Sequence, residues 1–313
     1  MSGLAPIAIF IFKRADHLRR TLQSLRQCSQ FADSKVVVYG DGPQSTQQIP
    51  AIEAARAIAM ELLGPQTEYN FRNENIGLAR SVIAGVGDMV ARFGRVIVIE
   101  DDLELSPTFL AYMNSALKLY EKQSEVFQIS GHMFDAPEMA RRGSAIFLPF
   151  TTTWGWGTWR RAWDRFDPSA AGWQLLQSDR DLRRRFNLGG HYDYAAMLER
   201  QMKGIGDSWG VRWYWSVFRH GGVACFPPQS LVQNIGMDGT GTHGKGALRA
   251  FRRQFELPGD VRIDFPCRVS VDQHDLDLVT ESIWRQNGGL IGAAVDVGRR
   301  HMSRLWSFRK WRA

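Results

Sequence analysis

The 313-residue sequence predicts an α/β fold in which helices flank a mixed, mostly parallel sheet. Apolar runs at 6–12, 34–42 and 95–102 alternate with segments of helical periodicity, an order typical of parallel sheets. Each run is continuously apolar rather than alternating in polarity, as expected for strands covered on both faces. From about residue 145 the composition becomes rich in aromatic residues, which predicts a second, aromatic-rich lobe.

The first half of the chain supplies the strand–helix alternation. Residues 6–12 form an apolar run with β-branched side chains, which predicts a buried strand. In the next segment, 13–28, Leu18, Leu22 and Leu25 recur at the spacing of one helix face. The same alternation then predicts a strand at 34–42, a helix at 51–64, a short strand and loop at 67–80, a helix at 79–94 and a strand at 95–102.

A further helix is predicted at 105–120, directly after an acidic turn. Ser106 is suited to the N-cap and Pro107 to the first helical position. The acidic turn is therefore expected to be held between a buried strand and a capped helix.

The second half is predicted to be an aromatic lobe. Five of the eleven tryptophans lie within residues 154–173. A charged helical stretch at 178–186, an aromatic one at 206–218, and a strand with a Gly-rich loop at 221–246 follow. We expect residues 1–145 to form one half of a single domain, 146–255 its second, aromatic-rich half, and 256–313 a C-terminal extension.

Composition narrows the class of protein. A net charge of +7 suits an anionic partner, but the basic residues are spread and no nucleic-acid-binding module is visible. The cysteines, Cys28, Cys225 and Cys267, show no metal-binding or disulfide spacing, which fits a reducing compartment. With neither a signal peptide nor an apolar run of about 18 residues, the predicted location is cytoplasmic.

Charged residues are predicted to meet at one edge of the sheet. In α/β folds of this kind ligands bind beyond the carboxyl ends of the strands, where Arg14, Asp41 and the triplet Glu100, Asp101 and Asp102 fall. Adjacent carboxylates repel unless a cation or hydrogen bonds compensate them, and hard oxygen ligands suit Mg²⁺ or Mn²⁺. The alternative is a solvated acidic turn before a helix.

Several segments resemble one enzyme family. "VIVIEDDLELSPTFLAYM" resembles inverting GT-A glycosyltransferases of the N-acetylglucosaminyltransferase I type, in which Glu-Asp-Asp replaces the more usual Asp-x-Asp. "PIAIFIFKRADHLRRTL", "YGDG", "WGWGTWRRAW" and "FPPQSLVQNIGMDGTGTHG" resemble further segments, in the same order, of this family and of bacterial sugar transferases. The resemblance spans roughly residues 5–245 and implies a GT-A fold and transfer from a nucleotide-sugar. It also implies that residues 1–145 form the nucleotide-sugar-binding half, 146–255 the acceptor and catalytic half of the same domain, and 256–313 a C-terminal extension with a basic, aromatic tail.

The resemblance implies roles for the residues at the strand ends. Asp102 would be the metal ligand, and Glu100 and Asp101 would contact the donor sugar and ribose. Arg14 and Asp41 would hold the nucleotide; an aspartate can accept from a uracil-type imide, and an arginine can meet phosphate or the base edge. Arg14 could equally be a surface cation.

The loop with Asn75 and Gly77 resembles the one beside the nucleotide, although a plain helix-entry turn is equally consistent. Asp207 occupies the position of the family's acid-acid-Trp motif, here Asp-Ser-Trp, and would be the catalytic base. Because one of the two acids is missing, a helix N-cap remains the alternative. His243, in a Gly-rich loop, would meet phosphate oxygens or complete the metal shell; the alternative is an ordinary mobile loop.

Trp154 or Trp156 is predicted to stack on the acceptor sugar, the alternative being packing between the lobes. The last fifteen residues, 299–313, carry six Lys or Arg and three large aromatic residues, which favours binding to an anionic membrane surface. The alternative is a solvated basic end or one packed on the body. An anchored enzyme would suit a lipid-linked glycan acceptor, as in assembly of surface polysaccharide.

The predicted function is metal-dependent inverting transfer of a sugar, UDP-linked by preference, to a glycan or lipid-linked glycan. The alternatives are a non-catalytic nucleotide- or glycan-binding protein on the same fold, and a nucleotidyltransferase. The latter would normally carry a Gly-rich loop after its first strand, which "FIFKRADH" lacks.

Overall fold

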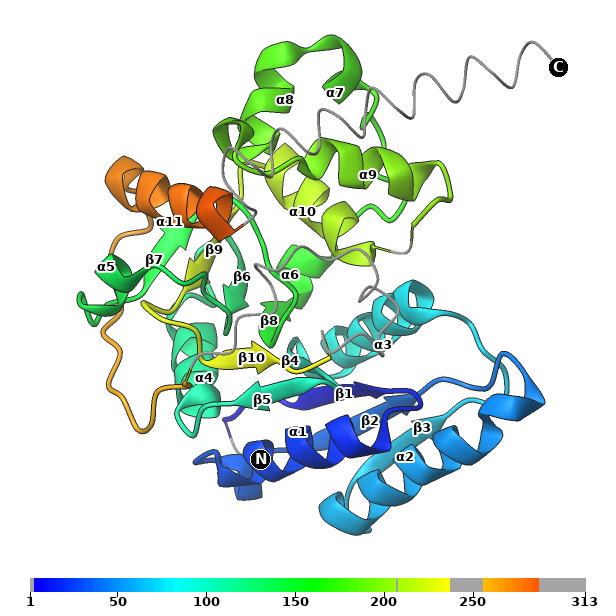
Figure 1. Ribbon diagram of the computed structural model, residues 1–313. Coiled ribbons are helices and arrows are strands. Elements are labelled where there is room, and N and C mark those ends of the chain that lie inside the picture. The colour runs from blue at the N-terminus through cyan, green and yellow to red at the C-terminus, as the bar shows by residue number, and fades with distance from the viewer. Residues whose placement is uncertain (1–2, 207, 237–255, 287–313) are drawn as a thin grey trace, which may run out of the picture.

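The computed structural model describes residues 3–206, 208–236 and 256–286, and in these it confirms the predicted α/β fold with a mixed, mostly parallel sheet (Figure 1). Eight strands of the described chain lie in the order β3-β2-β1-β4-β8-β6-β9-β7. The parallel half contains β1 (Ile7–Ile11), β2 (Val36–Gly40), β3 (Glu68–Phe71) and β4 (Arg95–Glu100).

The mixed half of the sheet joins the two halves of the chain. β8 (Trp156–Trp159) is antiparallel to both β4 and β6 (Val126–Ser130). β9 (Val223–Phe226) runs parallel to β6, and β7 (Ile146–Leu148) closes the edge in the antiparallel direction. A separate antiparallel pair, β5 (Leu103–Leu105) with β10 (Val232–Asn234), extends the turn after β4.

Helices cover both faces of the sheet, as the continuously apolar strands predicted. Ile7, Ile9 and Ile11 of β1 pack with α1 (Ala15–Gln27), α2 (Ile49–Leu63) and α4 (Phe109–Leu119). Ala8 and Phe10 point the other way, because side chains alternate along a strand. They pack with α3 (Leu78–Phe93), α6 (Arg160–Trp163) and α10 (Trp209–Arg219).

A second hydrophobic core fills the aromatic lobe. Its helices are α5 (Pro137–Ala140), α7 (Leu175–Ser178), α8 (Arg180–Phe186), α9 (Tyr194–Met202) and α11 (Gln273–Gln286). At its centre Phe186 stacks on Tyr214 and contacts Trp215 edge to face. No helix of the described chain has the length and apolar character needed to cross a bilayer.

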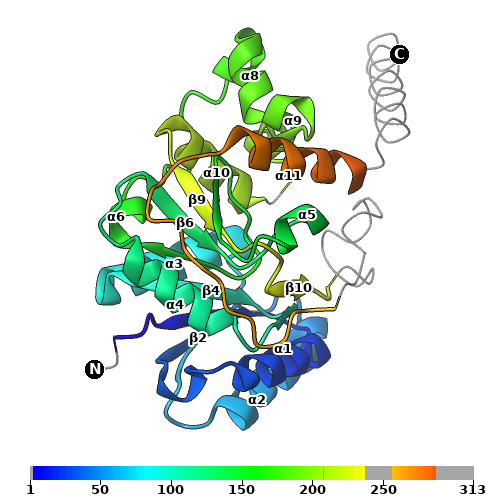
Figure 2. The same cartoon turned by 90° about the vertical axis from the view of Figure 1, so that its left-hand side faces the viewer.

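The described part of the predicted C-terminal extension packs onto the rest of the molecule. Figure 2 shows the segment before α11 running along the body from the β10 side toward α11. The Ser106 and Tyr120 hydroxyls donate to the carbonyls of Pro258 and Pro266, both at 2.8 Å. The predicted N-cap at Ser106 is therefore corrected: α4 begins at Phe109, and the Ser106 hydroxyl fastens the returning chain instead.

Candidate active site

The carboxyl ends of the parallel strands bring the predicted charged residues to one edge of the sheet. Arg14 follows β1, Asp41 follows β2, and the acidic triplet ends β4. Since β8 runs antiparallel to β4, its amino end also lies at this edge, and Trp156 pairs with Val98. The site therefore lies where the two halves of the chain meet.

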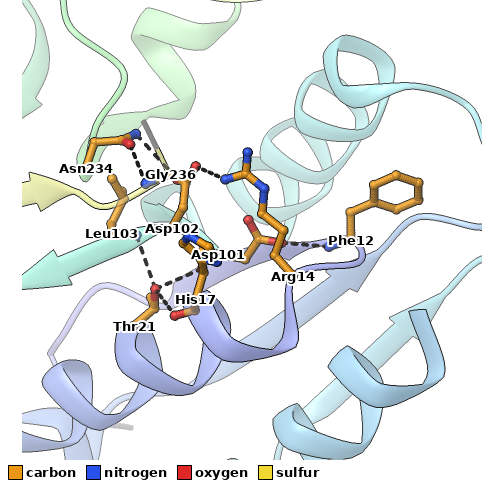
Figure 3. A network of polar contacts seen from close by, with 9 residues as sticks. All are labelled: Phe12, Arg14, His17, Thr21, Asp101, Asp102, Leu103, Asn234 and Gly236. Carbon is orange, nitrogen blue, oxygen red and sulfur yellow. Dashed lines mark hydrogen bonds and ion pairs between the residues drawn. The ribbon is translucent and has the colours of Figure 1, made fainter. Parts of the chain in front are cut away.

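Two of the acids are fixed to the segment that follows β1 (Figure 3). The Phe12 N–H donates to Asp101 Oδ2 at 3.0 Å, and Arg14 Nη1 donates to Asp102 Oδ2 at 2.7 Å. The Thr21 hydroxyl donates to the Asp101 carbonyl at 3.0 Å and accepts the Leu103 N–H at 3.1 Å. Helix α1 thereby fixes the backbone of the acidic turn through Thr21.

Residues at the end of β10 complete the surroundings of Asp102. The Ile235 N–H donates to the Asp102 carbonyl at 2.8 Å, and Asn234 Nδ2 lies 3.5 Å from Asp102 Oδ1. Asn234 Oδ1 accepts the Gly236 N–H at 2.9 Å. Gly236 lies so close that a Cβ there would overlap the Asp102 carboxylate and the Arg14 guanidinium.

Thr21, Asn234 and Gly236 were not among the predicted site residues. Asn234 and Gly236 belong to the segment "NIG", which resembles the family, but more than a hundred residues separate them from Asp102 in the sequence. The only signal available was their place directly before the Gly-rich loop. Thr21 gave no signal at all, because it lies inside an ordinary helical pattern.

The electrostatics of the triplet are unbalanced. Burial, together with repulsion from the neighbouring carboxylates, raises the pKa of Glu100 to about 8 and that of Asp101 to about 7. Burial also raises the pKa of Asp102, although the Arg14 guanidinium and the His17 side chain oppose the shift. Arg14 and His17 thus lie beside three acidic side chains, and the Arg14 and Asp102 side chains remain 18% and 16% exposed. A further cation could reach the site.

These donors suit a divalent cation whose remaining ligands come from the substrate. Within the described residues, no group of three or more His, Cys, Asp or Glu side chains is placed to hold a metal by itself. Mg²⁺ and Mn²⁺ often bind through one or two carboxylates, with water and substrate phosphates as the remaining ligands. The single aspartate Asp102 fits that pattern, and a bound cation would favour the ionised form of the two neighbouring acids, whose pKa values are raised in its absence.

Asp41, Asn75 and Gly77 lie together, but the Asp41 carboxylate accepts its hydrogen bonds from the backbone of this chain. The Asp41 carboxylate is 7% exposed and accepts the N–H groups of Gly42, Ile76 and Gly77 at 3.0–3.2 Å. Asn75 Nδ2 donates to the Gly42 carbonyl at 2.8 Å, and Gly77 has a positive φ of 83°. These residues build the turn into α3; a contact with nucleotide stays a prediction.

The two candidate acceptor tryptophans differ in position. Trp156 is 0% exposed and is enclosed by Trp163, Trp209 and Trp213, so that no ring face is open to a sugar. Trp154 is half-buried and lines a cavity of about 190 Å³ in the aromatic lobe. Trp154 alone therefore keeps the predicted role. Asp207 and His243 lie outside the described residues.

Comparisons with known proteins agree with the predicted resemblance. A model of the GNT-I family matches residues 86–185, the segment from α3 through the acidic triplet and the tryptophan-rich stretch to α8. A comparison with curated proteins gives no match.

Solved structures of sugar transferases resemble the chain distantly. The galactosyltransferase LgtC, in complex with donor and acceptor sugar analogues, is 11% identical, with 71% of this chain and 73% of that chain covered and a TM-score of 0.37. The mannosyltransferase PcManGT from Pyrobaculum calidifontis, in complex with GDP-Man and Mn²⁺, is 14% identical, with 97% and 82% covered and a TM-score of 0.41. These scores define neither a substrate nor the role of any residue.

Fold and family match together define a nucleotide-sugar glycosyltransferase of the GT-A type. The chain resembles the GNT-I family over the segment that carries the acidic triplet, and the predicted enzyme class is confirmed.

Proposed function

We propose that the chain is a metal-dependent, inverting glycosyltransferase that moves a sugar from a UDP-sugar to a hydroxyl of a glycan or lipid-linked glycan. The observation that carries the proposal is the acidic triplet at the end of β4, in which Asp102 pairs with Arg14 and is enclosed by the end of β10. An acidic, partly open site at the ligand edge of the sheet suits a cation that accompanies a nucleotide diphosphate.

Each residue of the site would have a separate role in binding the metal or the donor. Asp102 would hold Mn²⁺ or Mg²⁺, which would supply positive charge against a departing diphosphate. Arg14, which pairs with Asp102 in the structure, would meet phosphate oxygens once a metal ion takes its place on that carboxylate. Glu100 and Asp101 would contact donor sugar and ribose, while Asn75 and Gly77 would lie near the nucleotide.

Two residue roles and two features of the reaction rest on the family resemblance. Asp207 would take the proton from the acceptor hydroxyl as it attacks the anomeric carbon from the face opposite the diphosphate. His243 would meet the diphosphate or the metal. The UDP preference and inversion of the anomeric carbon follow from the same resemblance.

A nucleotide screen tests the donor site. We expect one nucleotide class among UDP-, GDP-, dTDP- and CMP-sugars, UDP by preference, to raise the melting temperature only with Mn²⁺ present, since ligands of the folded state stabilise it. Asp102→Asn should abolish that rise. Glu104→Gln, a change in the neighbouring strand β5, should keep it. Stabilisation of Asp102→Asn equal to that of the wild type, or unaffected by EDTA, would contradict the proposal.

Product analysis separates the alternatives. A glycosyltransferase releases UDP and joins the sugar to an acceptor or to water, with Asp207→Asn greatly slowed. A non-catalytic binding protein would hold the nucleotide-sugar intact, and a nucleotidyltransferase would release a sugar phosphate or pyrophosphate.

Residues 299–313 carry a separate part of the proposal, that the enzyme binds an anionic membrane surface where a lipid-linked acceptor would lie. Six basic residues and three large aromatics stand in this stretch. Full-length protein should co-sediment with phosphatidylglycerol vesicles at low salt, and a chain stopped at Gly298 should not. Equal sedimentation of the two would remove this part.

A further inference from the structure

The cavity beside Trp154 lies on the same edge of the sheet as the acidic triplet. Its walls come from the segment before β8, from the residues after β6, and from α9, α10 and α11. The amino end of β8 lies beside the carboxyl end of β4, because the two strands are antiparallel. Because Trp156 pairs with Val98, the segment Thr151–Trp154 before β8 lies near the end of β4 that carries Glu100.

The chemistry of the cavity is aromatic and uncharged. Phe134, Trp154, Tyr192, Tyr194 and Tyr214 supply aromatic side chains, and none of the described lining residues is Asp, Glu, Lys or Arg. Sugar rings present apolar C–H faces that pack on aromatic rings, and their hydroxyls need neutral donors and acceptors. A carboxylate or phosphate would lose its hydration there without gaining a counter-charge.

Two buried polar side chains of the wall lack partners in the described structure. Thr151 Oγ1 and His132 Nδ1 make no hydrogen bond, although these residues are only 6% and 5% exposed. Burial lowers the pKa of His132 to about 3, so its ring is neutral. Unpaired buried polar atoms are unfavourable, and both residues line the cavity.

We propose that this cavity binds an uncharged sugar ring of the acceptor, with Trp154 as a stacking surface and Thr151 and His132 as neutral hydrogen-bonding groups. The proposal rests on the proposed function, since it makes the cavity the acceptor side of the same site. The cavity, about 190 Å³, suits a single ring, and its lack of charge selects a neutral hexose or N-acetylhexosamine over a uronic acid or a phosphorylated sugar.

Ligand-observed saturation-transfer NMR on the full chain tests this selectivity. The probes are the methyl glycosides of glucose, galactose, mannose and N-acetylglucosamine, with methyl glucuronide and glucose 6-phosphate as charged counterparts, each with and without UDP and Mn²⁺. We expect at least one neutral glycoside to bind and the charged ones to give signals at least tenfold weaker. Binding of the charged probes as strong as that of the neutral ones, or no binding of any neutral glycoside in either condition, would overturn the proposal.

Variants locate the binding. Trp154→Ala and Thr151→Val should each weaken the neutral glycoside at least tenfold, whereas Trp173→Ala and Thr67→Val, which lie outside the cavity wall, should not. Melting temperatures verify that each variant folds. Unchanged binding in both folded cavity variants would also overturn the proposal.

The donor site is read separately, by the rise in melting temperature with UDP and Mn²⁺. That rise should persist in the cavity variants. Loss of it in the wild type would defeat the proposed function while leaving a sugar-binding cavity measurable by NMR.

Discussion

At the residue scale, the acidic triplet makes stability depend on pH. The pKa of Glu100 is raised to about 8 and that of Asp101 to about 7 from ordinary values of 4.5 and 3.8, so the folded chain keeps protons that the unfolded chain has lost. Stability of metal-free protein therefore falls as pH rises through this window.

We expect Glu100→Gln to flatten that fall, because the substituted side chain cannot ionise. Urea unfolding in EDTA at pH 5 and pH 8.5 measures the difference. Glu104→Gln serves as the control, since Glu104 pairs with Arg20 outside the triplet and should keep the wild-type slope. A wild-type slope in Glu100→Gln would mean that Glu100 titrates normally.

Asp41 shows how a residue chosen as a ligand contact can be needed by the chain itself. Its carboxylate accepts three backbone N–H groups of the turn into α3. Asp41→Asn leaves one acceptor oxygen and turns an amide N–H₂ toward the remaining donors. We expect the free energy of unfolding to fall by about 1.5–3 kcal/mol, the range for hydrogen bonds to charged groups. Urea denaturation checks this; Asp181→Asn, an exposed change on α8, should leave stability unchanged.

At the scale of elements, β10 acts on the site through its close approach. Gly236→Ala would push a methyl group into the Asp102–Arg14 pair. We expect the Mn²⁺-dependent stabilisation by UDP to drop at least tenfold in apparent affinity, with little change in the melting temperature of the unliganded protein. Gly259→Ala adds the same methyl group where nothing lies within 4 Å and should bind as the wild type does. Normal nucleotide affinity in Gly236→Ala would show that this contact is not used.

Some helices and strands could be predicted from the sequence and others could not. β1, β2 and β4 were predictable because each is a continuous apolar run, and α1 to α4 because each helix repeats its apolar face locally. β5, β8 and β10 have three or four residues, and their partners are far away in the chain, so no local pattern defined them. Trp156 and Trp154 share one motif, yet only tertiary packing distinguishes the enclosed ring from the one at the cavity.

The site likewise contains residues whose positions could be predicted and others whose positions could not. Arg14, Asp41 and the triplet could be brought together from sequence, since parallel strands end at one edge. The contact of Asn234 with Asp102 could not, because it depends on how β10 pairs with β5. Nor could the docking of α11 in the aromatic lobe be predicted, because Leu276, Val279 and Ile283 recur at the spacing of one helix face but local spacing does not say which surface that face covers.

At the scale of the whole molecule, the continuous sheet and the returning C-terminal segment should make the described chain unfold as one unit. Val279 of α11 is fully buried in the core of the aromatic lobe, although it follows the predicted boundary at residue 256. Val279→Asp places an unpaired charge in that core. We expect the single calorimetric transition to move down by roughly 4–5 °C, which corresponds to about 3 kcal/mol for a chain of 313 residues. Val271→Asp, a more exposed change just before α11, should move it by less than about 2 °C. A separate early transition in Val279→Asp, with the main one unmoved, would mean instead that residues 256–286 form an appendage independent of the sheet.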